Sequence, residues 1–258
     1  MGASEHDAVV RSSFEKQASI FGGDHSPFAR RPHSPLAWLE PVEPEMIVLD
    51  VACGAGHVAE QVAPHVRQVV GIDLTPSLLE LGAQRLREAG ITNVLLQEGN
   101  AAELPFLDAS FDLVVCRGAM HHFLHPEQPI AEMARVCRRE GRVVVSDMVA
   151  TSAEARERFD QVHRDLDPSH ARTLLEAELA DLLRSSVGPI AYGETSDPFA
   201  IPVDHILTDA ADRGAVMSAL RSELAGGPPT GFDPIVHGDE IHVSFTNTVV
   251  HATRNPAS

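Results

Sequence analysis

Two carboxylates and two glycines are the residues of this chain whose types and spacing best suit ligand chemistry. Asp50 lies near the end of an apolar run at residues 46–51, and Gly54 and Gly56 follow closely. Glycines let the backbone turn tightly and approach a ligand at points where a Cβ would collide. Asp73 ends a second apolar run and could accept hydrogen bonds from both hydroxyls of a ribose. The pattern predicts a site for a ligand that contains a nucleoside.

The carboxylate of Asp50 also indicates the charge of that ligand. The segment Gly54-x-Gly56-x-x-Ala59 fits a loose dinucleotide fingerprint, so the glycines alone leave NAD open. Asp50, however, would place a negative charge beside the turn at which a pyrophosphate binds, whereas a cationic ligand tolerates that charge far better. The chemistry favours a cationic nucleoside without phosphate, and an NAD-linked oxidoreductase is the weaker alternative.

Positioning these residues requires strands and helices that alternate along the chain. Apolar runs predict strands at residues 46–51, 68–73, 93–97, 113–116 and 142–147. Helical patterns predict helices at residues 57–62, 78–88, 130–137, 174–183 and 213–224. Such alternation is typical of a doubly wound parallel sheet, whose ligands bind at the carboxyl ends of the strands. Residues 240–251 alternate in part and are β-branched, which favours a last strand.

Composition predicts one α/β unit that acts on small molecules. The 258 residues are 43% hydrophobic, enough for a sizeable core. Twenty Lys and Arg against 37 Asp and Glu give a net charge of −17, which disfavours nucleic acids and anionic membrane surfaces as partners. No apolar run approaches the roughly 20 residues that span a bilayer, and the first residues lack an export signal. We expect a cytoplasmic protein, for which a homodimer is one possible state.

Several further blocks follow in a fixed order along the chain. They are Phe14-x-x-Gln-Ala-x-x-Phe21, residues 50–56, Asp73, and residues 99–106, 111–117 and 141–147. In these blocks the chain resembles the class I methyltransferases that use S-adenosylmethionine (SAM), and especially the ubiquinone and menaquinone biosynthesis C-methyltransferases. SAM carries a sulfonium and an α-amino group and no phosphate, in agreement with the favoured ligand.

The resemblance implies a Rossmann-like, doubly wound α/β domain over residues 1–258. Its sheet would have seven strands, with the last strand antiparallel to its neighbours. Residues 1–40 would cover the cofactor, and insertions at residues 149–170 and 203–239 would form a cap over the substrate pocket.

The resemblance also implies which residues surround SAM. The glycine loop would hold the methionine end of SAM, Asp73 the ribose, and Asn100 the adenine amino group. The full expected set is Phe14, Phe21, Asp50, Ala52, Cys53, Gly54, Gly56, Asp73, Leu74, Asn100, Ala101, Arg117 and His122.

Four positions in that set depart from the family pattern or have another interpretation. Ala52 replaces a common glycine, which a slightly wider turn could absorb, and Asn100 replaces the usual aspartate but can still accept through its amide oxygen. Phe14 and Phe21 would shield the cofactor, although their spacing is also that of one apolar helix face.

Histidines are the candidate catalytic groups. By the resemblance, His121 and His122 lie near the transferable methyl group, where either could deprotonate an acceptor or could simply shape the pocket through a backbone hydrogen bond. His170 belongs to the box Asp-Pro-Ser-His at residues 167–170. This box favours a cap for the following helix, and a His170 that faces the substrate is the alternative.

No metal site is expected. His121 and His125 have helical i, i+4 spacing, but Pro126 favours a loop, and only Glu127 lies nearby as a further ligand. We expect Glu154, Glu157 and Asp160 to lie on the solvated face of a helix and not at a cation site.

The function implied is transfer of a methyl group from SAM to a small-molecule acceptor by direct displacement, with O- or C-methylation favoured. Alignment of the groups in a dry pocket would provide most of the rate, so no nucleophilic side chain is required. The main alternative is a SAM-binding protein that catalyses a rearrangement or cyclisation. The identity of the acceptor stays open.

Overall fold

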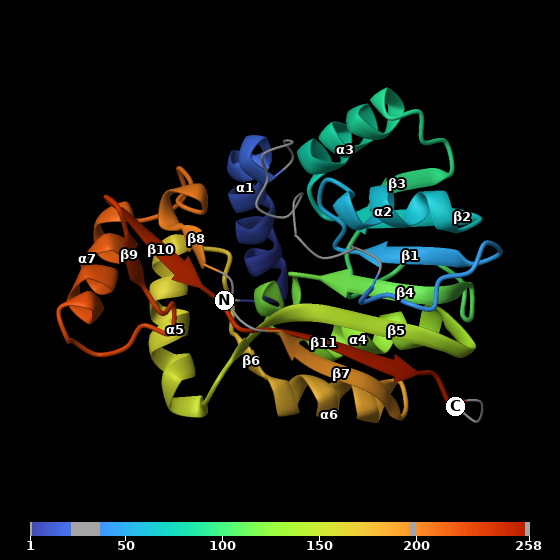
Figure 1. The fold of residues 1–258 in the computed structure, drawn as a ribbon. Coiled ribbons are helices and arrows are strands. Elements are labelled where there is room, and N and C mark those ends of the chain that lie inside the picture. Colours follow the sequence, from blue (N-terminus) through green and yellow to red (C-terminus); the bar gives the residue numbers. More distant parts are fainter. Residues whose placement is uncertain (1, 22–36, 197–199, 256–258) are drawn as a thin grey trace.

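A twisted sheet covered by helices on both faces forms the larger part of the molecule (Figure 1). The structure is a computed structural model that describes residues 2–21, 37–196 and 200–255. Among these residues, the main path of the sheet has the order β3, β2, β1, β4, β5, β11, β7. Their bounds are β1 Ile47–Val51, β2 Gln68–Asp73, β3 Val94–Glu98, β4 Phe111–Arg117, β5 Cys137–Ala150, β7 Ile190–Ser196 and β11 Asn247–Thr253. A short strand, β6 (Leu174–Leu175), pairs with the end of β5.

The path confirms the predicted doubly wound sheet of seven strands. Strands β1 to β5 are parallel, and β11 runs antiparallel to both β5 and β7. The register places Asp50 of β1 between Gly71 of β2 and Val115 of β4. Because the carboxyl ends of β1, β2, β4 and β5 share one edge, residues distant in sequence meet there.

Each central strand is buried on both faces. Along β1, Val48 packs into a core with α2 (His57–Val62), whereas Leu49 packs into a second core with α4 (Glu127–Val136) and α6 (Glu176–Ser186). Val48 and Leu49 are both fully buried, and burial of each side chain stabilises the fold by about 1.5–3 kcal/mol. The two cores fix the sheet edge that carries the site.

The remaining helices border that edge or lie beyond it. Helix α1 (Ala3–Phe21) stands next to α3 (Pro76–Glu88), on the side where the parallel strands end (Figure 1). Short 3₁₀ helices follow α2 and β4, at η1 Ala63–His65 and η2 Met120–His122. Within the described residues, no helix has both the length and the apolar character needed to cross a membrane.

A second, smaller layer, here called the cap, packs beside the sheet edge. It consists of α5 (Ala153–Leu166), η3 (Val203–His205), α7 (Arg213–Leu224) and a three-stranded sheet. That sheet has the order β8 (Ala200–Pro202), β10 (Glu240–Ser244) and β9 (Ile235–His237). Its core includes Phe159 and Phe232, whose rings stack at 4.6 Å.

The predicted last strand at residues 240–251 is wrong as a single strand. Its first part, β10, pairs with β8 and β9 in the cap, and only β11 joins the main sheet. The Ser244 amide donates to Phe232, and Val243 packs into the cap core, so these residues are held away from β5. The ladder with β5 therefore begins at Asn247.

Candidate functional site

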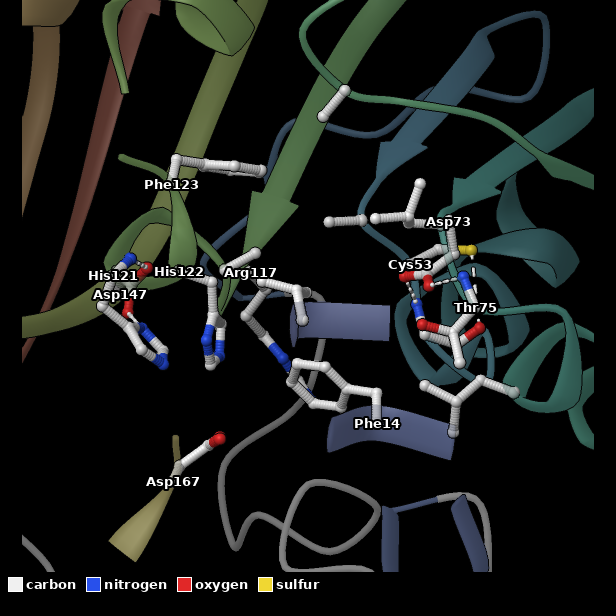
Figure 2. Close-up of a pocket in the computed structure, with 18 of the residues that line it drawn as sticks. Phe14, Cys53, Asp73, Thr75, Arg117, His121, His122, Phe123, Asp147 and Asp167 are labelled. Carbon is white, nitrogen blue, oxygen red and sulfur yellow. Dashed lines mark hydrogen bonds and ion pairs between the residues drawn. The ribbon is translucent and has the colours of Figure 1, made fainter. Parts of the chain in front are cut away.

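A cavity of about 240 Å³ opens at the shared carboxyl edge of the strands, between the main sheet, α1 and the cap. Figure 2 shows its two ends: Cys53, Asp73 and Thr75 on one side, His121, His122 and Asp147 on the other, and Arg117 and Phe14 between them. The cap contributes the apolar side chains Ile201, Ile206 and Phe245 to the histidine end. The predicted nucleoside loop and the predicted histidine pair thus line one cavity.

The turn after β1 uses left-handed backbone at alternate residues. Ala52, Gly54 and Gly56 have φ angles of 53°, 55° and 71°. Ala52 thus takes the left-handed conformation that favours glycine, at a cost of about 1–2 kcal/mol. The Cys53 amide donates to Ile72 at 3.0 Å, which ties the turn to β2.

Asp73 holds this turn and faces the cavity. Its Oδ2 accepts from the Gly54 amide at 2.7 Å, and its Oδ1 accepts from the Thr75 amide at 2.8 Å. Burial raises the pKa of Asp73, while these hydrogen bonds oppose the rise. The carboxylate lines the cavity, where it can meet a diol of a bound ligand.

Asp50 is a buried carboxylate beside the glycine turn. It is 1% exposed, and its Oδ2 accepts from the Ala59 amide at 3.2 Å. Burial raises its pKa to about 7, while the positive charge of Arg117, at the end of β4, lowers it in part. A cation bound beside Asp50 would stabilise its ionised form.

Asn100 connects the expected adenine end to α1. Its Nδ2 donates to Asp7 Oδ2 at 3.0 Å, and its Oδ1 accepts from the Ala102 amide at 2.9 Å. Asp7 and Asn100 both line the cavity, as do Leu74 and Ala101. The structure thus places a carboxylate from α1 beside the position at which the resemblance expects an aspartate.

Helix α1 covers the cavity through Phe14. The Phe14 ring meets the His122 ring edge-on, with centroids 5.0 Å apart. Ser13 Oγ donates to Asp167 Oδ1 at 3.0 Å and joins α1 to the end of α5. The side chain of Phe21, like residues 22–36 of the expected covering segment, lies outside the described residues.

His121 and Asp147 form a buried pair at the other end. His121 Nδ1 and Asp147 Oδ1 lie 2.7 Å apart, and Asp147 Oδ2 accepts from the Met120 amide at 2.5 Å. Burial alone would lower the pKa of His121, but the charge and hydrogen bond of Asp147 raise it. The pair is an imidazole oriented by a carboxylate, with the imidazole at the cavity wall.

His122 also lines the cavity but differs in charge. Burial, followed by the charge of His121, lowers its pKa to about 3, so His122 is a neutral imidazole at ordinary pH. Its Nδ1 lies 3.0 Å from Ser169 Oγ and 3.2 Å from the Ser169 carbonyl oxygen. These contacts suit a group that positions a ligand better than one that takes up a proton.

The box at residues 167–170 does not cap a following helix, so that prediction is wrong. Asp167 ends α5, its Oδ1 accepts from the Ser169 amide at 2.9 Å in a side-chain turn, and α6 begins only at Glu176. The His170 side chain is fully buried, and its Nε2 lies 2.7 Å from Asp160 Oδ1. His170 is not among the described residues that line the cavity, so a substrate-facing position does not fit it.

Asp160 corrects a second expectation. Glu154 and Glu157 are exposed as predicted, but Asp160 is 7% exposed because it lies on the face of α5 that packs inward with Phe159 and His163. The two histidines considered for a metal, His121 and His125, have different surroundings. His121 lines the cavity, whereas His125 forms an exposed ion pair with Glu127 at 3.3 Å.

The sequence interpretation missed three residues of this site. Asp147 ends the predicted strand at residues 142–147, as Asp73 ends the predicted strand at residues 68–73, and the same rule could have found it. Asp7 and His163 carry no such local signal. Their place in the cavity depends on how α1 and α5 pack against the sheet.

Known proteins share this fold and these blocks. Methyltransferase YcgJ of Bacillus subtilis is 39% identical over 126 residues, which are 48% of this chain and 50% of YcgJ. Its crystal structure superimposes with a TM-score of 0.72 and 26% identity, covering 84% of this chain and 95% of that chain. The demethylmenaquinone methyltransferase of Listeria welshimeri is 36% identical over 104 residues, 39% of this chain and 44% of the relative.

The matched region thus spans about half the length of these curated relatives or less. A family model described as a methyltransferase domain matches residues 42–185, which include the glycine turn, Asp73 and the histidine pair. That span is more than half of the chain. The chain therefore belongs to the methyltransferase domain family.

Proposed function

We propose that this protein is a SAM-dependent methyltransferase that methylates a small, largely apolar acceptor at oxygen or carbon. The observation that carries the proposal is the single cavity, in which a carboxylate-rich glycine turn and an apolar chamber with histidines are continuous. Membership of the methyltransferase domain family supports the same chemistry. SAM, when bound, supplies a methyl group activated by a sulfonium.

The residues along the cavity suit the successive parts of SAM, from its methionine end to its adenine. Asp50 would face the positive charge of the methionine end, and Arg117 would face its carboxylate. Asp73 would accept from the ribose hydroxyls. Asn100 and Asp7 would meet the adenine, with Asp7 supplying the charge that Asn100 lacks.

The other end of the cavity would take the acceptor. Phe245, Ile201 and Met148 offer apolar surface there, which excludes water and favours an acceptor with few polar groups. His121 would contact the reacting polar group of the acceptor, held in place by Asp147. The relatives named demethylmenaquinone methyltransferase support a small-molecule acceptor.

Calorimetric titration with SAM, S-adenosylhomocysteine and NADH tests the cofactor. Binding of the first two ligands without NADH is expected, and binding of NADH alone would replace the proposal with the oxidoreductase alternative. An acceptor screen that measures S-adenosylhomocysteine release then tests methyl transfer. If an acceptor is converted while SAM is not consumed, the rearrangement alternative holds instead.

A further inference from the structure

Three histidines from three parts of the chain meet at the cavity wall. They are His121 of η2, His163 of α5 and His170 of the loop after α5, here called the histidine cluster. One ring nitrogen from each lies within 4.8 Å of the others, and all three side chains are buried. His121 and His163 line the cavity, whereas His170 lies behind them.

Two carboxylates orient this cluster from behind. Asp147 Oδ1 lies 2.7 Å from His121 Nδ1, and Asp160 Oδ1 lies 2.7 Å from His170 Nε2. These contacts leave Nε2 of His121 and Nδ1 of His170 to face other partners. A carboxylate on the far nitrogen of an imidazole is the usual arrangement behind a metal-bound histidine.

Within the described residues, two nitrogens of the cluster are buried without a hydrogen-bond partner. They are Nδ1 of His163 and Nδ1 of His170. His170 turns its other ring nitrogen, Nε2, to Asp160, so a neutral imidazole would keep the lone pair on the buried Nδ1. A buried polar atom without a partner is costly, and a bound ion is one way in which proteins satisfy it.

We propose that His121, His163 and His170 bind one divalent transition-metal ion of the Zn²⁺ type. Three imidazoles are a common ligand set for Zn²⁺, with a fourth position left for water or substrate. Tetrahedral Zn–N bonds of about 2.0–2.1 Å place ring centroids about 5 Å apart. Those of His121 lie 5.5 Å from His163 and 5.7 Å from His170.

Binding requires one local adjustment. The rings of His163 and His170 stack at 4.1 Å, closer than in a tetrahedral site, so one of them must turn until its lone pair points at the ion. His163 is suited to turn, because its Nδ1 has no partner to lose. Charge favours the ion as well, since the carboxylates of Asp147 and Asp160 stand behind two of the ligands.

Binding of the ion does not depend on methyl transfer, but its consequence for the acceptor rests on the proposed function. The open position of the ion faces the cavity, because His121 and His163 form the cavity wall. An acceptor with an oxygen donor could occupy that position, and coordination would lower the pKa of its hydroxyl. The site therefore indicates acceptors that carry a hydroxyl or an enolisable carbonyl.

Titration of the chelator-treated, untagged protein with Co²⁺ and Zn²⁺ tests the site. We expect one Co²⁺ per chain with the intense visible absorption of a four-coordinate centre, and loss of this absorption when Zn²⁺ displaces Co²⁺.

Three variants test which residues bind the ion. His163→Phe keeps an aromatic ring among Phe159 and Phe232 but removes a ligand, so it should abolish this absorption. Asp160→Asn should weaken binding about 10- to 100-fold. The matched control is His65→Gln, an exposed histidine of η1, which should bind as the wild type does.

Equal Co²⁺ spectra in wild type and His163→Phe, or no four-coordinate centre in the wild type, would overturn the proposal. If His163→Phe does not fold, X-ray absorption of the wild-type Zn²⁺ form decides between three imidazole ligands and a shell without them. SAM is titrated into the same samples. A wild-type protein that binds SAM but no metal overturns only the metal site, whereas a wild-type protein that binds metal but no SAM overturns only the proposed function.

Discussion

Asp50 couples the binding of a cation to the release of a proton from its carboxyl group. Its buried carboxyl has a pKa raised to about 7, first by burial, so near neutral pH part of the unliganded protein carries it protonated. A cation binds best beside the ionised form. The affinity for SAM should therefore increase as the pH rises through the range of this pKa, by up to about tenfold per unit below about 7.

The test is calorimetric titration with SAM between about pH 5.5 and about pH 7, where the α-amino group of SAM keeps its charge. Asp50→Asn should bind more weakly and without this pH dependence. Adenosine, which carries no cation, is the control ligand and should bind equally across the range. A wild-type affinity for SAM that does not change with pH would show that Asp50 does not face the cation.

The same carboxyl has the opposite effect on the unliganded fold. Because its folded pKa lies above the usual 3.8, the native state holds more protons than the unfolded state between about pH 4 and about pH 7. The contribution of Asp50 to the free energy of unfolding therefore decreases as the pH rises through that window. SAM binding and apo stability should thus respond to pH in opposite directions.

Asp73 supplies the second test at the scale of single residues. Asp73→Ala removes the proposed ribose acceptor and the acceptor of the Gly54 amide, and should weaken SAM binding by on the order of 1–3 kcal/mol. Glu98→Ala is the matched control, since Glu98 ends the neighbouring strand β3 but pairs with Arg11 on the surface. Equal affinities of the two variants for SAM would place the ribose elsewhere.

Local sequence was enough to predict Asp50, Asp73 and the glycine turn, because each lies at the end of an apolar strand or just after it. It was not enough for Asp160 and His163. Both lie in a charged segment whose composition is that of a solvated helix. Their burial depends on how α5 packs against Phe232 and against the loop that follows α5. Residues of this second kind require the tertiary structure.

Among the elements, α1 is the one held to the site mainly by polar contacts. His6 Nε2 lies 2.7 Å from the His122 carbonyl oxygen, Ser13 binds Asp167, and Asp7 accepts from Asn100. Among the described residues, Phe14 and Ala18 of α1 form a small apolar core with Ala55 and Leu78. Such a helix can be released by changes of single hydrogen bonds.

Asn100→Asp tests this attachment, although it restores the residue that the family resemblance expects. Two carboxylates would then face each other, so amide hydrogen exchange in α1 should accelerate and SAM affinity should fall. The exchanged pair Asp7→Asn with Asn100→Asp recreates the hydrogen bond in reverse and should restore both. If the single variant protects α1 as the wild type does, the contact between Asp7 and Asn100 does not hold the helix.

The limits of sequence prediction are also visible in the elements. The alternation of strands and helices and the doubly wound sheet were predicted, whereas β7 and the division of residues 240–251 into β10 and β11 were not. Tyr192 and Glu194 leave β7 exposed at the sheet edge, with little apolar signal. The change of partner after Ser244 depends on the cap core, which no local pattern contains.

At the scale of the whole molecule, the cavity lies between two bodies with separate cores. The main sheet has its cores around β1 and β4, and the cap has its own around Phe159 and Phe232. The two bodies meet at the histidine end of the cavity, where Phe245 of the cap lies 5.3 Å from Phe232 and lines the cavity. Among the described residues, the cofactor end is lined by α1, the main sheet and the loops and helices that follow its strands.

Phe232→Ala should therefore affect the two ends of the cavity differently. The ring is 1% exposed, and its loss should cost about 3–5 kcal/mol of stability. Hydrogen exchange measured by mass spectrometry should accelerate in α5, α7 and β10 but not in β1, and SAM affinity should stay near that of the wild type. Phe111→Ala, which opens a comparable cavity in the core of the main sheet, should show the reverse pattern of exchange. If exchange accelerates equally in the cap and the main sheet in either variant, the two bodies unfold as one unit. Acceptor binding would then be coupled to the cofactor end through the whole fold.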